Sequence, residues 1–177
     1  MHRLYLRHLQ GGALAPLTAR MAAKLDASLV GADTAGGGDD LFAFVCEHMF
    51  RAGTDTLFGD GCATAEAATQ FAAFDKMFPA LAAGVPARLL SRAVSARDTL
   101  ARMFLPTAHD ARVCPIGFIS DRQRVLGGRV PPADIAKFQT SIFWGAHANT
   151  LPATFWVYAQ VSPALSIGSA EYLFLPA

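Results

Sequence analysis

The sequence predicts an all-α fold, and three of its features support this prediction. Apolar residues recur at steps of three and four along most of the 177 residues, the period of a helix with one buried face. Clusters of glycine and proline separate these periodic segments. The alternating apolar and polar runs that are typical of strands are nearly absent. The length fits one domain.

The first predicted helix covers residues 14–29, with an apolar stripe of Leu14, Leu17, Met21, Leu25 and Leu29. It ends in G-A-D-T-A-G-G-G-D-D, a glycine-rich loop at residues 31–40. The aspartates that close this loop suit the start of a second helix over residues 41–58. The breaker cluster Gly59-Asp60-Gly61 ends that helix.

A third helix is predicted over residues 64–78, ending before Pro79, and a fourth over residues 87–104. The fourth has an apolar side with Leu89, Leu90, Val94, Leu100 and Met103 and a solvated side with Arg88, Arg92, Arg97 and Arg102. A loop over residues 106–115 and a short helix over residues 118–126 follow. Pro131-Pro132 then opens the longest predicted helix, over residues 133–160.

The composition excludes several classes of function. Hydrophobic residues make up 53% and charged residues 16%, so the chain buries much of itself or packs against something else. The net charge is +1 without any lysine- or arginine-rich run, which argues against nucleic-acid binding. Cys46, Cys62 and Cys114 are far apart in sequence and form no C-x-x-C pair, so buried free thiols in a reducing compartment are expected.

The uncharged stretch over residues 138–170 has the length of a membrane span. Polar residues and prolines interrupt it, namely Gln139, Asn149, Thr150, Pro152, Gln160 and Pro163. Because polar groups are costly at bilayer depth, a buried helix of a large soluble domain is the favoured interpretation.

Most short motifs carry no chemistry. Glu47-His48 lacks the second histidine of a zinc-protease motif, so a structural role is expected. Gly36-Gly37-Gly38 has neither a preceding strand nor a following lysine, so it is a linker and not a phosphate loop.

The predicted helix over residues 133–160 is the exception. One face carries Gly145, Ala148, Asn149, Pro152 and Trp156. Pro152 has no N–H for the Ala148 carbonyl, so we expect a kink there beside the Asn149 amide. Two interpretations stay open on chemistry alone: a kinked core helix with a satisfied asparagine, or a seat for a flat ligand and ordered waters.

The segment W-G-A-H-A-N-T-L-P-A-T-F-W, residues 144–156, is similar to the I helix of cytochromes P450 in the group of cholesterol 7α-hydroxylase, sterol 12α-hydroxylase and prostacyclin synthase. Four further segments resemble that group's C-to-D, E, F and G helices in order: Leu9–Met21, Phe42–Gly59, Phe71–Pro86 and Ser95–Ala101. The resemblance implies a partial cytochrome P450 domain over residues 1–160, from the C helix to the I helix.

The resemblance also implies a function. A haem-thiolate monooxygenase that hydroxylates a sterol is expected, with electrons from NADPH–cytochrome P450 reductase at the endoplasmic reticulum membrane. Asn149, Ala148 and Pro152 are the expected catalytic residues, and Trp144, Ala148 and Asn149 would line the sterol. Arg7 and Ala148 would contact the haem, with Arg7 pairing a propionate. An exposed surface arginine is an equally weighted alternative for Arg7.

The resemblance has departures and gaps. Leu151 and Pro152 stand where most haem-thiolate monooxygenases carry an acid–threonine pair, so Asn149 with ordered water is the expected proton route. Cys114 lies in A-R-V-C-P-I-G, ahead of residues 144–156 and without the glycine and phenylalanine of the iron-ligand loop. We therefore predict that it is not the thiolate, and we predict no metal ligand. An E-x-x-R pair is also absent.

Two expectations concern the chain as a whole. Residues 161–177 do not continue the resemblance, and an unspliced intron beginning at Val161 would explain them. The chain is then expected to be an inactive enzyme fragment, with residues 78–86 in an apolar region that contacts the membrane and admits substrate. The competing hypothesis is a non-catalytic helical protein that associates with membranes or with other proteins.

Overall fold

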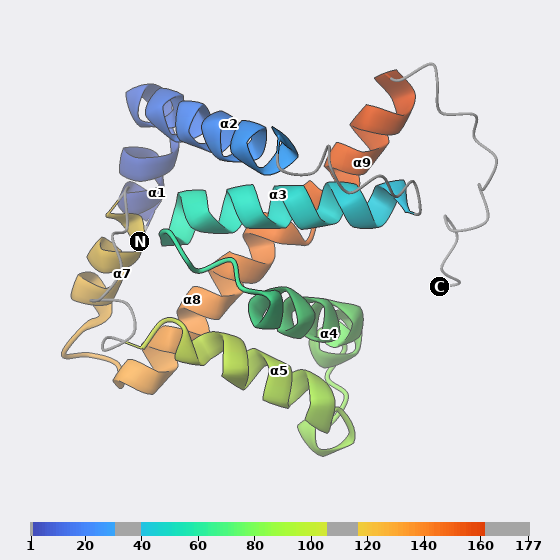
Figure 1. The fold of residues 1–177 in the computed structure, drawn as a ribbon. Helices are drawn as coiled ribbons and strands as arrows, with labels where there is room; N and C mark the ends of the chain where they lie inside the picture. Colours follow the sequence, from blue (N-terminus) through green and yellow to red (C-terminus); the bar gives the residue numbers. More distant parts are fainter. Residues whose placement is uncertain (1, 31–39, 106–116, 162–177) are drawn as a thin grey trace.

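Every regular element in the computed structural model is a helix within the residues it describes, which are 2–30, 40–105 and 117–161 (Figure 1). The predicted all-α class is confirmed. The elements in chain order are α1 (His2–Leu9), η1 (Gly11–Ala13), α2 (Leu14–Val30), α3 (Leu41–Phe58), α4 (Ala65–Ala82), η2 (Ala87–Leu89), α5 (Ser91–Arg102), α7 (Phe118–Leu126), α8 (Pro132–His147) and α9 (Thr150–Val161).

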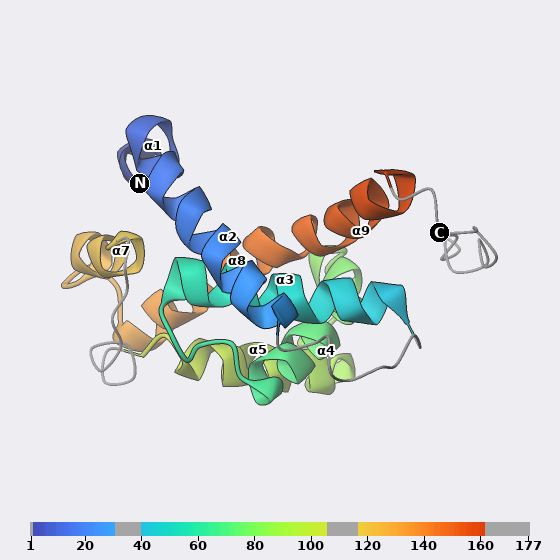
Figure 2. The same cartoon turned by 45° about the horizontal axis from the view of Figure 1, so that its top comes forward.

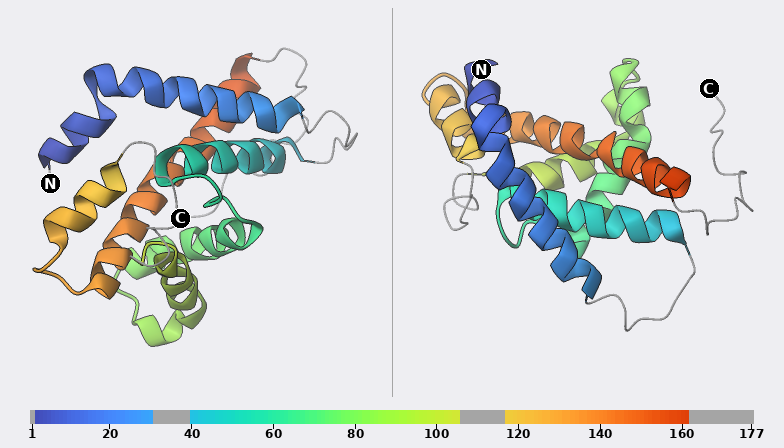
Figure 3. Two further views of the ribbon diagram at one scale, coloured as in Figure 1. Left: turned by 60° about the vertical axis from the view of Figure 1, so that its left-hand side comes forward. Right: turned by 90° about the horizontal axis from the view of Figure 1, so that it is seen from above.

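Helices α8 and α9 follow one another diagonally through the molecule, and the other helices pack around them (Figure 1). α2 covers α3, and α3 in turn packs on α9. α4 and α5 pack on each other, and α5 rests on α8. α1 and α7 lie side by side at the end away from α9 (Figures 2 and 3).

The ends of several helices follow from local sequence. Asp40 caps α3, because its Oδ1 accepts hydrogen bonds from the backbone N–H groups of Phe42 (2.8 Å) and Ala43 (3.1 Å). Gly59 ends the same helix with φ at 109°, a value that favours glycine. The predictions for residues 14–29, 41–58 and 118–126 are confirmed to within one residue.

Two of the predicted helix ends were wrong. α4 continues through Pro79 to Ala82, because a proline in the last turn removes only one hydrogen bond. The helix then ends at a turn in which the N–H of Ala83 bonds the carbonyl of Pro79 at 2.9 Å. The segment over residues 87–104 is not one helix, because Leu90 leaves the helical conformation between η2 and α5.

The burial of two predicted stripes also differs. Leu89, placed on the apolar side, is 69% exposed, and small residues such as Ala93 and Ala96 form much of the buried face of α5. On α2 only Leu17 is fully buried, whereas Leu14 and Leu29 are exposed. Helical spacing therefore predicted where the helices lie in the sequence better than it predicted which of their side chains are buried.

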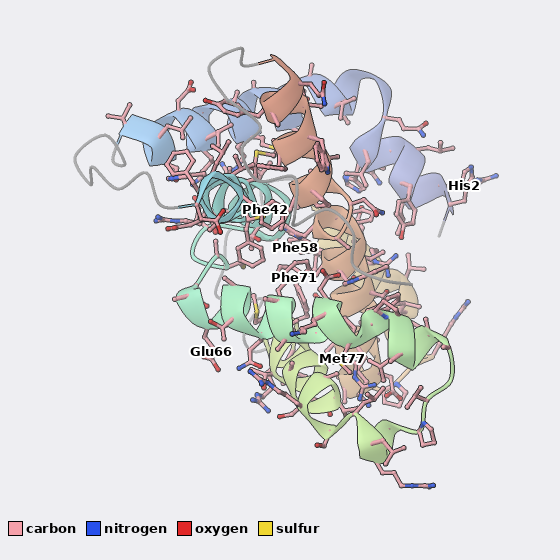
Figure 4. The ribbon with its side chains drawn as sticks, turned by 90° about the vertical axis from the view of Figure 1, so that its right-hand side faces the viewer. His2, Phe42, Phe58, Glu66, Phe71 and Met77 are labelled. Atoms are coloured by element: carbon pink, nitrogen blue, oxygen red, sulfur yellow. The ribbon has the colours of Figure 1, made fainter. Side chains whose placement is uncertain are left out.

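An aromatic cluster forms the centre of the core. Phe143 of α8 is fully buried, and its ring lies 5.2–5.9 Å from the rings of Phe50, Phe58, Phe71 and Phe104. Figure 4 shows Phe58 and Phe71 in the space between α3 and α4, whereas Glu66 projects from α4 away from it. This cluster fixes α8 against α3, α4 and the turn that follows α5.

Within the described ranges, no helix combines the length and the apolar character that crossing a bilayer requires. The uncharged stretch that begins at residue 138, which has the length of a membrane span, is divided between α8 and α9 as far as Val161. The predicted loop at residues 106–115, Cys114 and residues 162–177 lie outside the described residues.

Candidate functional site

The junction between α8 and α9 is the candidate site. The sequence predicted one kinked helix over residues 133–160, but the structure has two helices separated by Ala148 and Asn149. The N–H of Ala148 still bonds the Trp144 carbonyl at 2.9 Å, and the N–H of Ala153 bonds the Asn149 carbonyl at 3.1 Å. Pro152 has no N–H for the Ala148 carbonyl, which places the interruption at this turn.

One side of the junction is open. Gly145 is exposed, and a Cβ atom added to it would meet nothing within 4 Å. Asn149 is exposed as well, while Ala148, Pro152 and Trp156 are half-buried. The junction therefore presents small residues and one carboxamide at its accessible surface.

The opposite side of the junction is held firmly by His147, which is only 2% exposed. Its Nδ1 lies 2.8 Å from the Phe143 carbonyl, which can only accept, so this nitrogen carries the proton. In the neutral ring Nε2 then accepts a hydrogen bond from the Thr54 hydroxyl at 3.1 Å. Burial lowers the pKa of His147, so the ring stays neutral. Leu151, also buried, anchors the first turn of α9.

Sequence reasoning missed this role of His147. Gly53 of α3 lies beside the ring, where an added Cβ atom would be 3.4 Å from Nε2, an ordinary van der Waals distance. Thr54 and His147 are 93 residues apart in sequence. No local pattern links residues at that separation, and only the fold brings them together.

Trp144 contacts α4. Its Nε1–H donates to Asp75 Oδ1 at 2.7 Å, and its ring stacks on Phe78 with centroids 3.7 Å apart and planes 21° apart. Ala148 and Asn149 were predicted to share a site with Trp144. In this structure Trp144 contacts α4, whereas Asn149 faces the open side.

Arg7 lies on α1, and its side chain is 72% exposed. One guanidinium nitrogen is 3.7 Å from Asp121 Oδ2, which also accepts a bond from His8 Nε2 at 2.9 Å. Arg124 pairs with the other oxygen of the same carboxylate. The Arg7 guanidinium therefore keeps most of its surface free for a second anion.

Arg122 is a buried cation that sequence reasoning did not single out. Its Nε donates to Gln139 Oε1 at 2.8 Å, and Nη1 donates to the Tyr5 hydroxyl at 3.2 Å. The guanidinium also lies 5.6 Å from the centroid of the Phe118 ring. Burial lowers the pKa of Arg122. The residue joins α1, α7 and α8.

The other predicted motifs have structural partners. His48 faces α2, where its Nδ1 lies 2.6 Å from the Ser28 hydroxyl, and Glu47 pairs loosely with Arg51 at 3.9 Å. In the part of the chain that the structure describes, no group of three His, Cys, Asp or Glu side chains could hold a metal ion. A cavity of about 470 Å³ lies elsewhere, between Phe104 and the turn at residues 127–132.

No family model matches the chain, but several curated proteins do. The cholesterol 7-alpha-monooxygenase of Cricetulus griseus is 33% identical over 97% of this chain and 38% of its own length. The cytochrome P450 7A1 of Oryctolagus cuniculus is 32% identical over 88% of this chain and 34% of its own length. The 5-beta-cholestane-3-alpha,7-alpha-diol 12-alpha-hydroxylase of Sus scrofa is 29% identical over the same shares. The chain spans 34% to 38% of the length of these relatives.

Proposed function

The chain belongs to the cytochrome P450 family, in the group that includes cholesterol 7-alpha-monooxygenase, and on this premise we propose that it forms part of a sterol hydroxylase. The relatives' names refer to hydroxylation of cholesterol and of a cholestane diol. The observation that supports this function best is the open junction at Ala148 and Asn149, which lies inside the segment with the strongest resemblance.

We infer that a haem would bind at the open side of the junction. A flat macrocycle needs small residues beneath it, and this inference is supported by the small side chains at Gly145 and Ala148 and by the unobstructed space at Gly145. Arg7 offers a largely exposed guanidinium that suits a propionate. When bound, haem with a thiolate ligand activates molecular oxygen. Ala148 would lie against the haem, and Arg7 would pair with one propionate.

The role of Asn149 in this proposal is proton delivery. Its carboxamide can donate and accept at once, so it can hold and orient ordered water at the open side, and this water would carry the proton. Leu151 is buried in the core and Pro152 has no N–H, so neither can replace it. The asparagine thereby takes the role of the acid–threonine pair found in most haem-thiolate monooxygenases.

Substrate entry and partners follow from the same proposal. The turn between α4 and α5 exposes Val85 and Leu89, which suits contact with the surface of the endoplasmic reticulum membrane. The sterol would enter along this turn, and NADPH–cytochrome P450 reductase would supply the electrons.

Sterol binding tests the proposal. The purified chain is titrated with a conjugated-triene sterol, whose absorption overlaps tryptophan emission, and energy transfer from Trp144 and Trp156 is recorded. We expect the energy transfer to saturate as the sterol concentration rises. Asn149→Leu is expected to change this transfer, and palmitate is not expected to displace the sterol. Energy transfer that never saturates would contradict a sterol site. Displacement of the bound sterol by palmitate as readily as by unlabelled sterol would contradict it as well.

A further inference from the structure

The contact between Trp144 and α4 joins two helices whose backbones do not pack along their length. α4 packs chiefly on α5 and reaches α8 through large side chains. Trp144 supplies one of these bridges. Its indole N–H donates to Asp75 at 2.7 Å, and its ring lies flat on Phe78.

Both partners of Trp144 are arranged for this contact. Asp75 and Phe78 are three residues apart, so they lie on one side of α4. Phe78 also meets the buried Phe74 edge to face, with centroids 5.8 Å apart, and this contact keeps its ring in place for the stack. Together, Asp75, Phe78 and Trp144 form what we call the α4–α8 joint.

The joint lies next to the candidate site. Trp144 is one helical turn before Ala148, and the N–H of Ala148 bonds the Trp144 carbonyl. Asp75 and Phe78 lie in the half of α4 that leads into the exposed turn at Val85. A hydrogen bond to a carboxylate is stronger and more directional than a contact between neutral groups, so it fixes position as well as distance.

We propose that Asp75, acting through Trp144, is the positioning residue that holds the C-terminal half of α4 against α8 and thereby shapes the sterol side of the site. The second half of this statement rests on the proposed function. We place Asp75 in contact with neither sterol nor haem. It acts by setting where α4 lies relative to Ala148 and Asn149.

Hydrogen exchange of the backbone amides over residues 75–82 of the whole chain tests the joint. Asp75→Ala and Trp144→Phe each remove the indole hydrogen bond, and each is expected to speed exchange in this segment by about tenfold. Asp75→Asn keeps an acceptor oxygen and is expected to restore slow exchange. Glu66→Ala removes the other carboxylate of α4, from an exposed position, and should leave residues 75–82 unchanged.

A second measurement separates the joint from the proposed function. Affinity for the conjugated-triene sterol is expected to fall severalfold in Asp75→Ala and to recover in Asp75→Asn. Unchanged exchange in Asp75→Ala would overturn the joint. Faster exchange with unchanged sterol affinity would overturn its role in the site. Faster exchange in a chain whose unsubstituted form binds no sterol would overturn the proposed function and leave α4 positioning intact.

If Asp75→Ala fails to fold, the comparison of Trp144→Phe with Asp75→Asn decides the question. Trp144→Phe keeps an aromatic ring over Phe78 but has no N–H to donate. Equal exchange rates in these two variants would overturn the proposal. Faster exchange in Trp144→Phe alone would support it.

Discussion

His147 is the residue that fixes the end of α8. It donates to the Phe143 carbonyl and accepts from Thr54, and it does so as a neutral ring because it is buried among aromatic side chains. Protonation would place a charge in this apolar environment and would remove the acceptor that Thr54 uses. The stability of the fold should therefore depend on pH through this residue.

Burial lowers the folded-state pKa of His147 below 6.5, so the unfolded chain binds more protons as pH falls. The contribution of His147 is complete above about pH 6.5 and is lost below it, at up to about 1.4 kcal/mol per pH unit. Urea unfolding at pH 7.5 and 5.5 measures this loss. His147→Gln does not titrate and should show a smaller decrease. An equal decrease in both proteins would contradict the assignment.

At the residue scale, sequence patterns predicted what depends on near neighbours. The Asp40 cap and the absence of an N–H at Pro152 were accessible in this way. The partners of Trp144 and His147 were not, because they lie 69 and 93 residues away along the chain. The spacing that put Trp144 and Asn149 near each other could not show that α4 engages the indole.

At the element scale, the interruption between α8 and α9 results from one missing donor. The prediction of a single helix was wrong in extent, because α8 ends at His147 and α9 begins at Thr150, although Ala148 keeps helical dihedral angles and its hydrogen bond to the Trp144 carbonyl. Helical spacing cannot distinguish a bend from a break, since both keep the same residues on one face. The location at Pro152 was nevertheless predictable.

Restoring the donor should close the interruption. Pro152→Ala supplies an N–H to the Ala148 carbonyl, and we expect more helix and a free energy of unfolding higher by about 1–2 kcal/mol. Far-UV circular dichroism and urea unfolding measure these changes. Pro132→Ala is the control, because proline at the first helical position costs nothing and its removal should bring no gain. Equal effects of both substitutions would argue against Pro152 as the cause.

The attachment of α1 to α7 is a second feature of how the helices are held together. Arg122 and Asp121 of α7 hold α1 through Tyr5 and His8. Tyr5→Phe removes one acceptor of a buried cation and keeps the ring, so a loss of about 1 kcal/mol is expected. Hydrogen exchange in α1 should rise at the same time. Tyr158→Phe, at a half-exposed position on α9, is the matched control and should change neither quantity.

At the scale of the whole molecule, large apolar side chains remain exposed around the helices. Phe138 on α8 is 52% exposed, and Val157 on α9 is 64% exposed. Composition had already indicated a chain that packs against something else, because only 16% of its residues are charged. The family expectation of a helical arrangement agrees with the structure.

Exposed surface of this kind should make the isolated chain associate with itself. Sedimentation at increasing protein concentration should give a rising average mass. Replacing Phe138 and Val157 together by Ser should lower that mass at a given concentration, while Phe138→Leu keeps the apolar surface and should not. A concentration-independent monomer would contradict the expectation.

We propose that Asn149, through ordered water, delivers protons at the junction between α8 and α9. The decisive variant is Asn149→Leu in a full-length cytochrome P450 of the cholesterol 7α-hydroxylase group that carries the same A-N-T-x-P segment. The quantity to measure is the fraction of NADPH consumed that appears as hydroxysterol. We predict a fall of at least about tenfold, with hydrogen peroxide in its place. An unchanged fraction would contradict the claim.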